Sequence, residues 1–323
     1  DGSEGSIRRM LIENDNIEAI IGLPADIFFG TGIPTIIMVL RKSRPSSDVL
    51  IIDASKGYKK EGKKNKLQAS DIKRIVDTYI GREDVPKYAR LVSKDEIRAN
   101  GYNLNIPRYV NSSDDVETWD LYSTMFGGVP KAELSAMDCY WKAFVGLKEA
   151  LFKSTDTPQT EFCVDDIRES VESHPSVIAF KNLYADKFGG FGSMLHEHLL
   201  ENMMSLNIAT EEDSITSYIF QQLELMPLVD RFAAYQLFAD KWKTISQDLE
   251  IIQSEGFGAT RIVDKNMVTK KKDDKEYEVQ EGWIGRILPF ELVQTTFLKT
   301  EWQSLRDKEN RLDVVSSETE ETM

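Results

Sequence analysis

Two neighbouring aromatic residues beside a glycine-rich turn are the residues best placed to contact a substrate. Phe28 and Phe29 follow an apolar segment at 17–24 and precede a Gly-Thr-Gly sequence at 30–32. Glycines let a chain reverse direction without steric cost, and exposed aromatic faces can stack on a base. The pattern fits either a plain turn or one wall of a substrate pocket. The predicted wall residues are Phe28, Phe29, Gly30 and Gly32.

A lysine-rich stretch at 57–66 is a second candidate contact. Its sequence, GYKKEGKKNK, holds five lysines and two glycines, which is typical of a solvated, mobile loop. Lysine side chains also replace the counterions that DNA phosphates release when a protein binds. The stretch is therefore either a solvated connection or a contact to the DNA backbone. In the second case the contacts are Lys59, Lys60, Lys63 and Lys64.

Other chemical patterns are weak, and no metal site is predicted. His196 and His198 are two residues apart, so on a helix their rings point to opposite sides and cannot share a zinc ion. FGGFG at 188–192 lacks both a preceding strand and a following Gly-Lys-Ser/Thr, and it predicts a break between helices. Asp26 and Asp53 each follow a strand, where α/β folds place their sites, but a turn-capping role is favoured for Asp53.

Composition limits the possible functions. The chain has 323 residues, 41% of them hydrophobic and 29% charged, with a net charge of −14. The length predicts two or three domains, and no apolar run approaches the roughly 20 residues that cross a bilayer. Cys139 and Cys163 are predicted to be reduced thiols of a cytoplasmic protein. The acidic total argues against DNA binding by the whole surface but permits a local basic patch.

Hydrophobic periodicity predicts an α/β arrangement over residues 1–110. The run at 36–40 has no polar residue, as expected for a strand covered on both faces. Only a short turn separates the strands at 34–42 and 49–55, so these two are predicted to form an antiparallel hairpin. The predicted elements are a helix at 6–13, strands at 17–24, 34–42 and 49–55, a helix at 69–79 and a strand at 89–92.

The later sequence predicts a mainly helical domain at 111–315 and an acidic, disordered tail at 316–323. Residues 259–288 predict a small β-hairpin on that domain. A helix at 291–312 carries an apolar stripe. The other predicted helices are at 114–125, 131–152, 164–172, 193–207, 211–224 and 228–254.

The succession of segments resembles the later part of the methylation (M) subunits of type I restriction–modification systems, which are site-specific adenine-N6 DNA methyltransferases. The likeness extends over nearly the whole chain, and the order of the segments carries it. The segments are IRRMLIENDNIEAIIGLPADIFFGTGIPTIIMVLRK (7–42), VLIIDASKGY (49–58), YNLNIPRYV (102–110), GGVP (127–130), YWKAFVGLKEALF (140–152) and EGWIGRILPFELVQ (281–294).

The resemblance implies a class I methyltransferase sheet that binds S-adenosylmethionine and a flipped adenine. The family's two motifs are an Asp-Pro-x-x-Gly-x-Gly turn and Asn-Pro-Pro followed by Phe or Tyr. Neither is present, because none of the ten prolines adjoins another or follows Asn or Asp. The chain is therefore expected to be the C-terminal portion of an M subunit, inactive alone. It would hold the last strands of an incomplete sheet, including the terminal antiparallel hairpin, and then the helical domain.

The resemblance also implies partners: DNA, a specificity (S) subunit that reads the DNA, a restriction (R) subunit and a second M subunit. The C-terminal helices of the family pack on the S subunit. The apolar stripe here either forms that surface or packs inside its own domain. The predicted partner-helix residues are Leu292, Phe297, Leu298, Trp302 and Leu305.

Three alternatives stay open at this stage. A non-enzymatic helical adaptor predicts a self-contained sheet without an exposed edge, whereas the M-subunit hypothesis predicts an edge that other polypeptide must cover. A nucleic-acid-binding module acting through 57–66 predicts salt-sensitive DNA binding. A fragment of a single-chain adenine methyltransferase is the nearest enzymatic alternative.

Overall fold

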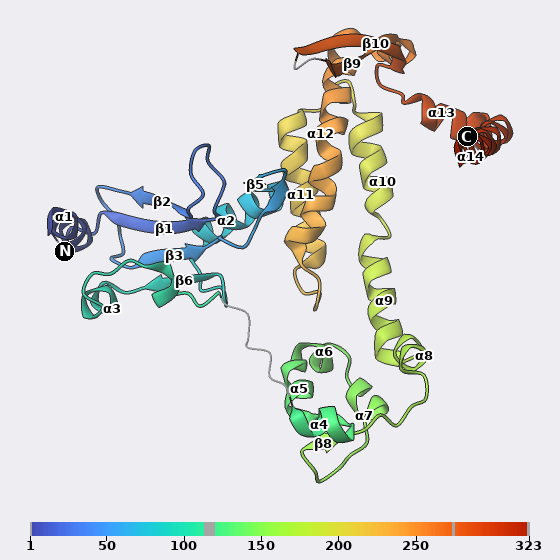
Figure 1. The fold of residues 1–323 in the computed structure, drawn as a ribbon. Coiled ribbons are helices and arrows are strands. Elements are labelled where there is room, and N and C mark those ends of the chain that lie inside the picture. The colour runs from blue at the N-terminus through green and yellow to red at the C-terminus, as the bar shows by residue number, and fades with distance from the viewer. Residues whose placement is uncertain (1, 113–119, 273–274, 322–323) are drawn as a thin grey trace. The chain divides into compact units, whose positions relative to one another are not determined.

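The computed structural model describes residues 2–112, 120–272 and 275–321 (Figure 1). The chain forms two compact units, one of residues 1–190 with 214–240 and one of 191–213 with 241–323. The boundaries of these two units differ from the domain boundary predicted at residue 110. That residues 1–110 belong to the catalytic domain stays a prediction. Within the described ranges, no helix combines the length and the apolar character needed to span a membrane.

A four-stranded sheet organises the start of the first unit, in the order β2-β1-β3-β6. β1 and β3 are parallel, and β2 and β6 are antiparallel to their neighbours. Every residue of β1 and β3 is buried, because both strands are mainly apolar and lie at the centre of the sheet. The strands are β1 (Ile17–Leu23), β2 (Thr35–Leu40), β3 (Val49–Asp53) and β6 (Ala89–Val92).

Helices cover both faces of this sheet. On one face, Ile12 of α1 (Gly2–Glu13) and Ile97 of α3 (Lys94–Ala99) pack with Ile20 and Ile51. On the other, Ile75 of α2 (Ala69–Gly81) packs with a second set of strand residues, which includes Ile21 and Ile52. Alternate side chains of a strand point to opposite faces, so each buried strand supplies both cores.

The predicted hairpin between 34–42 and 49–55 is wrong, because both strands pair with β1 from opposite sides. The connection between them passes the start of β1. There Arg44 Nε donates to the carbonyl of Asp15 at 2.6 Å, and its Nη1 donates to the carbonyl of Asp48 at 3.0 Å. β2 and β3 run in opposite directions, so a short connection suffices to place them on either side of β1.

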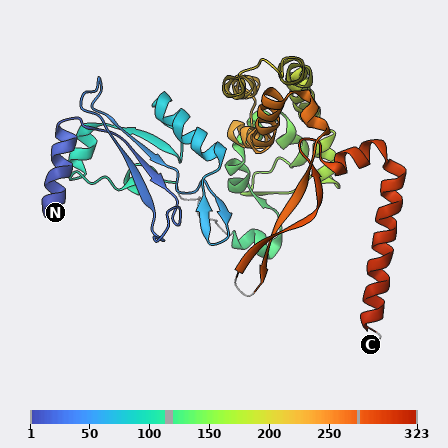
Figure 2. The same ribbon diagram turned by 90° about the horizontal axis from the view of Figure 1, so that it is seen from above.

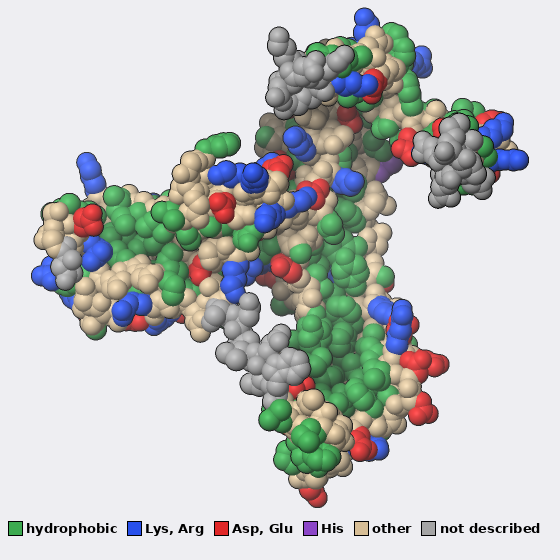
Figure 3. Space-filling view, in the orientation of Figure 1, with side chains coloured by type: hydrophobic (Ala, Val, Ile, Leu, Met, Phe, Trp, Pro, Cys, Tyr) green, Lys and Arg blue, Asp and Glu red, His purple; other side chains and the backbone are tan. Residues whose placement is uncertain are grey.

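The expectation that β2 is covered on both faces is also wrong. β2 is an edge strand, and Ile36, Ile37, Met38 and Leu40 are exposed, with Ile36 at 54%. Figure 3 shows hydrophobic side chains gathered over this part of the sheet. Both buried strands, by contrast, have a strand of this same chain on each side. The sheet therefore has a complete centre and an uncovered apolar edge.

Residues 120–188 of the first unit form mainly short helices, which pack around an aromatic core. Trp141, Phe144 and Phe152 pack against buried Leu147 and Leu151. The predicted helix at 131–152 is broken, and its second break includes Gly146, whose φ of +84° suits glycine. The elements are α4 (Leu121–Phe126), β7 (Val129–Pro130), α5 (Lys131–Ala136), α6 (Asp138–Ala143), α7 (Leu147–Leu151), β8 (Gln159–Thr160), α8 (Ile167–Glu172) and α9 (Pro175–Phe188).

Two longer helices, α11 (Ile208–Leu223) and α12 (Arg231–Glu255), divide their residues between the two units. The break predicted at FGGFG lies at 189–190, between α9 and α10 (Phe191–Leu195). α10 leads into a π-helical segment, His196–Glu201. 3₁₀ turns lie at Ile106–Arg108 in the first unit and at Phe257–Arg261 in the second.

The predicted β-hairpin of the second unit is confirmed as β9 (Val263–Lys272) and β10 (Lys275–Gly285), drawn as a twisted ribbon in Figure 2. The predicted helix at 291–312 is instead two helices, α13 (Phe290–Phe297) and α14 (Lys299–Glu321), separated at Leu298. α14 is helical to Glu321, where a disordered tail was predicted from 316. Glu is a good helix former and no Pro or Gly interrupts this segment, so the helix can continue.

Candidate nucleic-acid interface

The aromatic residues predicted to form a pocket wall lie in the turn after β1 and are exposed to solvent. Phe28 is exposed, and Phe29 is 96% exposed. Gly30 has φ +79°, a conformation that favours glycine. A side chain at Gly32 would place its Cβ 3.4 Å from Oδ1 of Asp26, so this glycine keeps the turn tight. The free ring of Phe29 is available for stacking on another flat group.

The lysine-rich stretch is a two-stranded hairpin rather than a mobile loop. β4 (Lys59–Glu61) pairs antiparallel with β5 (Lys64–Lys66). Gly62, between the strands, has φ +62° and allows the tight reversal. The predicted DNA-contact residues Lys59, Lys60, Lys63 and Lys64 thereby belong to one ordered element.

The structure brings this hairpin and the aromatic turn together. Lys64 Nζ donates to the carbonyl of Phe28 at 3.0 Å and lies 5.6 Å from the centroid of the Phe29 ring. Asn65 Nδ2 donates to the carbonyl of Ala25 at 2.9 Å, and its backbone N–H donates to that of Asp26 at 3.2 Å. The two predicted sites are thus one surface, which we call the turn–hairpin surface (residues 25–33 and 58–66).

The charges of the turn–hairpin surface are largely free. Lys66 pairs with Glu61 at 3.1 Å, but Lys59, Lys60 and Lys63 are exposed and pair with no carboxylate in the described part of the chain. Lys and Arg side chains gather where β4 and β5 lie (Figure 3). Lysine side chains on the same surface as an exposed aromatic ring are a combination found in proteins that bind single-stranded nucleic acid.

Sequence reasoning missed Asn65, which fastens the hairpin to the turn through two hydrogen bonds. The only signal was one amide side chain within a run of lysines. The favoured turn-capping role of Asp53 is confirmed, since its Oδ1 accepts from the N–H of Ser55 at 3.1 Å. Its Oδ2 accepts from Oγ of Ser112 at 2.5 Å, so both carboxylate oxygens are occupied within the protein.

A small cavity of about 290 Å³ lies beside Asp53 at the same end of β3. In its wall, the Arg74 guanidinium carbon is 4.1 Å from the centroid of the Tyr88 ring. Burial raises the pKa of Tyr88 to about 12.

The predicted partner-helix residues lie at the end of the second unit and are mostly open to solvent. Leu292, Phe297, Leu298 and Leu305 are exposed, with Phe297 at 79%. Trp302 is half-buried under the Arg306 guanidinium, whose carbon is 4.7 Å from the indole centroid. Figure 2 shows α14 standing clear of the β9–β10 ribbon of its own unit. We call these five residues and their two helices the C-terminal apolar surface.

Comparison with known proteins shows what the first part of the chain is similar to. Residues 1–118 match the family model of N-6 DNA methylases. The methylase subunit of the type I restriction enzyme MpnII of Mycoplasma pneumoniae is 35% identical over 122 residues, which are 38% of this chain and 22% of that protein. The methylase subunit of MjaVII from Methanocaldococcus jannaschii is 37% identical over 145 residues, 42% of this chain and 25% of the other.

Among solved structures, that of the type I restriction–modification methyltransferase subunit from Streptococcus thermophilus is similar to this chain. It has 47% sequence identity, a TM-score of 0.35, and coverage of 35% of this chain and 24% of that one. The matched part of this chain thus spans about a quarter of the length of these relatives.

Residues 1–118 are thus similar to the N-6 DNA methylases. Within that class, the relatives of this chain are M subunits of type I restriction–modification systems, and the predicted resemblance to these subunits is confirmed. The three matches cover 35–42% of the chain. The likeness inferred for segments beyond residue 118 stays a prediction.

Proposed function

We propose that this chain is the C-terminal part of a longer M subunit, here called the parent, which methylates N6 of adenine in a specific DNA site. S-adenosylmethionine is the proposed methyl donor, and S, R and further M subunits are the proposed partners. The match of residues 1–118 to the N-6 DNA methylases is the observation that carries this proposal.

The uncovered edge of β2 supports the same conclusion. Beyond Ile36 and Met38, apolar side chains also stay exposed on the helices of both faces of the sheet, including Met10 of α1 and Val76 of α2. A sheet that ended at β2 would have no use for apolar side chains at this edge and on the flanking helices. We infer that further strands of the parent pair with β2 and are covered by the same helices.

We expect the described residues to form no complete cofactor site of their own. At the end of β3, where α/β folds bind ligands, both oxygens of Asp53 are already hydrogen-bonded to Ser55 and Ser112. The sequence holds neither of the motifs that the family uses for S-adenosylmethionine and the target adenine. The turn–hairpin surface is therefore assigned to DNA alone: Phe29 stacks on a base, and the three free lysines face phosphates.

Of the alternatives, a non-enzymatic adaptor accounts for the complete centre of the sheet but not for the apolar edge at β2. A stand-alone nucleic-acid-binding module is favoured by one observation, the free lysines of β4 and β5. This alternative also assigns the turn–hairpin surface to nucleic acid, but it requires no methyltransferase parent. A single-chain adenine methyltransferase differs from the proposal only in lacking an S subunit.

Methyl transfer by the parent tests the proposal. We expect the parent, mixed with its S subunit and labelled S-adenosylmethionine, to form N6-methyladenine in duplex DNA. Residues 1–323 alone should form none and should bind no cofactor at micromolar concentration in calorimetry. Absence of N6-methyladenine with a folded parent would contradict the assigned reaction. Micromolar cofactor binding by residues 1–323 would show that the site lies within this chain.

A further inference from the structure

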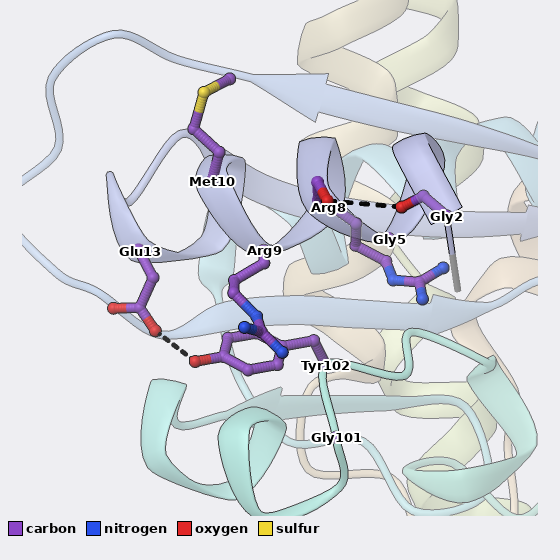
Figure 4. Close-up of a pocket in the computed structure, with 9 residues that line it drawn as sticks. Gly2, Gly5, Arg8, Arg9, Met10, Glu13, Gly101 and Tyr102 are labelled. Atoms are coloured by element: carbon purple, nitrogen blue, oxygen red, sulfur yellow. Dashed lines mark hydrogen bonds between the residues drawn. The ribbon is translucent and has the colours of Figure 1, made fainter.

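A pocket of about 490 Å³ lies between α1 and the turn that follows α3, away from the turn–hairpin surface. α1 leads into the start of β1, whereas the turn–hairpin surface begins where β1 ends. Arg8, Arg9 and Glu13 line the pocket from α1, and Tyr102 closes it from the other side (Figure 4). Figure 4 shows both arginines leaving α1 on the side away from Met10.

Arg9 is held in place by a chain of three contacts. Its guanidinium carbon lies 4.8 Å from the centroid of the Tyr102 ring, so one face of the guanidinium is covered. The Tyr102 hydroxyl donates to Oε1 of Glu13 at 2.7 Å. Arg98 donates to both oxygens of Glu13, from Nε at 2.9 Å and from Nη2 at 2.6 Å. Tyr102 is therefore a fixed platform for Arg9.

Glu13 forms no ion pair with Arg8 or Arg9 in the described part of the chain. The hydrogen bonds from Arg98 and Tyr102 hold the pKa of Glu13 at about 2, so it stays ionised and committed to those two partners. Arg8 and Arg9 have no carboxylate partner in the described part of the chain, and Nε of Arg8 is shielded from water without a hydrogen-bond acceptor. Shielded donors are nearly always paired in folded proteins, so Nε of Arg8 lacks the acceptor expected for it.

We propose that this pocket binds a phosphate group, with Arg9 and Arg8 as its donors and Tyr102 as a positioning residue. A guanidinium that stacks through its face keeps its N–H edge free, and that edge matches two phosphate oxygens. Gly2 and Gly5 line the first turns of α1 without side chains, which leaves room at the pocket for the rest of the ligand. The phosphate belongs either to the DNA backbone or to a free phosphate compound.

Titration of residues 1–323 with two probes distinguishes the sources. We expect inorganic pyrophosphate to shift the Nε–Hε NMR signals of Arg8 and Arg9 in a saturable manner if the pocket takes free phosphates. If the pocket binds a phosphate of the DNA backbone, a DNA duplex should shift these signals and pyrophosphate should leave them unchanged. Lack of any shift with both probes would overturn the proposal.

Variants separate the pocket from general charge. Arg9→Gln should weaken binding of the active probe at least about tenfold, the loss expected for one charge-assisted hydrogen bond. Arg168→Gln removes an equal charge from α8, where Arg168 pairs with Glu172 at 3.0 Å, and should leave binding unchanged. Tyr102→Leu should weaken binding while Arg9 remains. Equal affinity of Arg9→Gln and the unsubstituted chain would contradict the assignment.

Discussion

Replacing Lys59, Lys60 and Lys63 with glutamate is expected to weaken DNA binding by the parent by more than two orders of magnitude at low salt. The three ammonium groups are exposed and unpaired with carboxylates in the described residues. Removing one lysine–phosphate interaction lowers the salt slope of the binding constant by about 0.9. We therefore expect the slope to fall by about three, measured by fluorescence anisotropy over a series of salt concentrations.

The matched control for this variant changes the net charge equally at another place. Lys181, Lys241 and Lys243 are exposed lysines outside the turn–hairpin surface. Their joint replacement by glutamate should leave the salt slope within experimental error, because phosphate contacts act locally. An unchanged slope in the hairpin variant would remove the turn–hairpin surface from the DNA interface. An equal loss in the control would show that total charge alone governs binding.

Replacing Phe297 and Leu305 with glutamate is expected to abolish stable association of the parent with its S subunit. Burial of each side chain contributes about 1.5–3 kcal/mol, so removing both corresponds to at least about 100-fold in affinity. Both side chains are exposed in this chain, so the thermal unfolding temperature of residues 1–323 should change little. Size-exclusion chromatography and surface plasmon resonance measure the association.

Leu225 and Leu237 provide the control, since both are exposed leucines outside α13 and α14. Their double glutamate variant should associate with the S subunit as the unsubstituted parent does. Undiminished association of the Phe297 and Leu305 variant would exclude the C-terminal apolar surface as the contact. A large drop in its unfolding temperature would favour the alternative in which these residues pack inside their own domain.

Local sequence patterns predicted the elements of the sheet better than their pairing. The apolar segments at 17–24 and 49–55 predicted the strands β1 and β3, and both are fully buried. The run in β2 is just as apolar, yet β2 lies at an edge. Strand order depends on tertiary contacts such as those of Arg44 with Asp15 and Asp48, which leave no periodic signal.

In the candidate site, too, the sequence predicted the separate parts but not the contacts between them. The residue types of the aromatic turn and the lysine stretch identified both parts separately. The two parts are joined by hydrogen bonds from Lys64 and Asn65 to main-chain carbonyl groups. Every residue has such a carbonyl group, so the sequence does not indicate which ones accept. The break between α13 and α14 at Leu298 was not predicted either, because neither Gly nor Pro marks it in the sequence.

Hydrogen exchange at β2 tests most directly the inference that the sheet continues beyond this strand. In residues 1–323, amides of 35–40 that do not pair with β1 should exchange as rapidly as exposed backbone. In the parent the same amides should be protected by at least about 100-fold, because a further strand supplies their acceptors. Equally rapid exchange in both proteins would show that β2 is a true outer edge, and it would contradict the proposed continuation of the sheet.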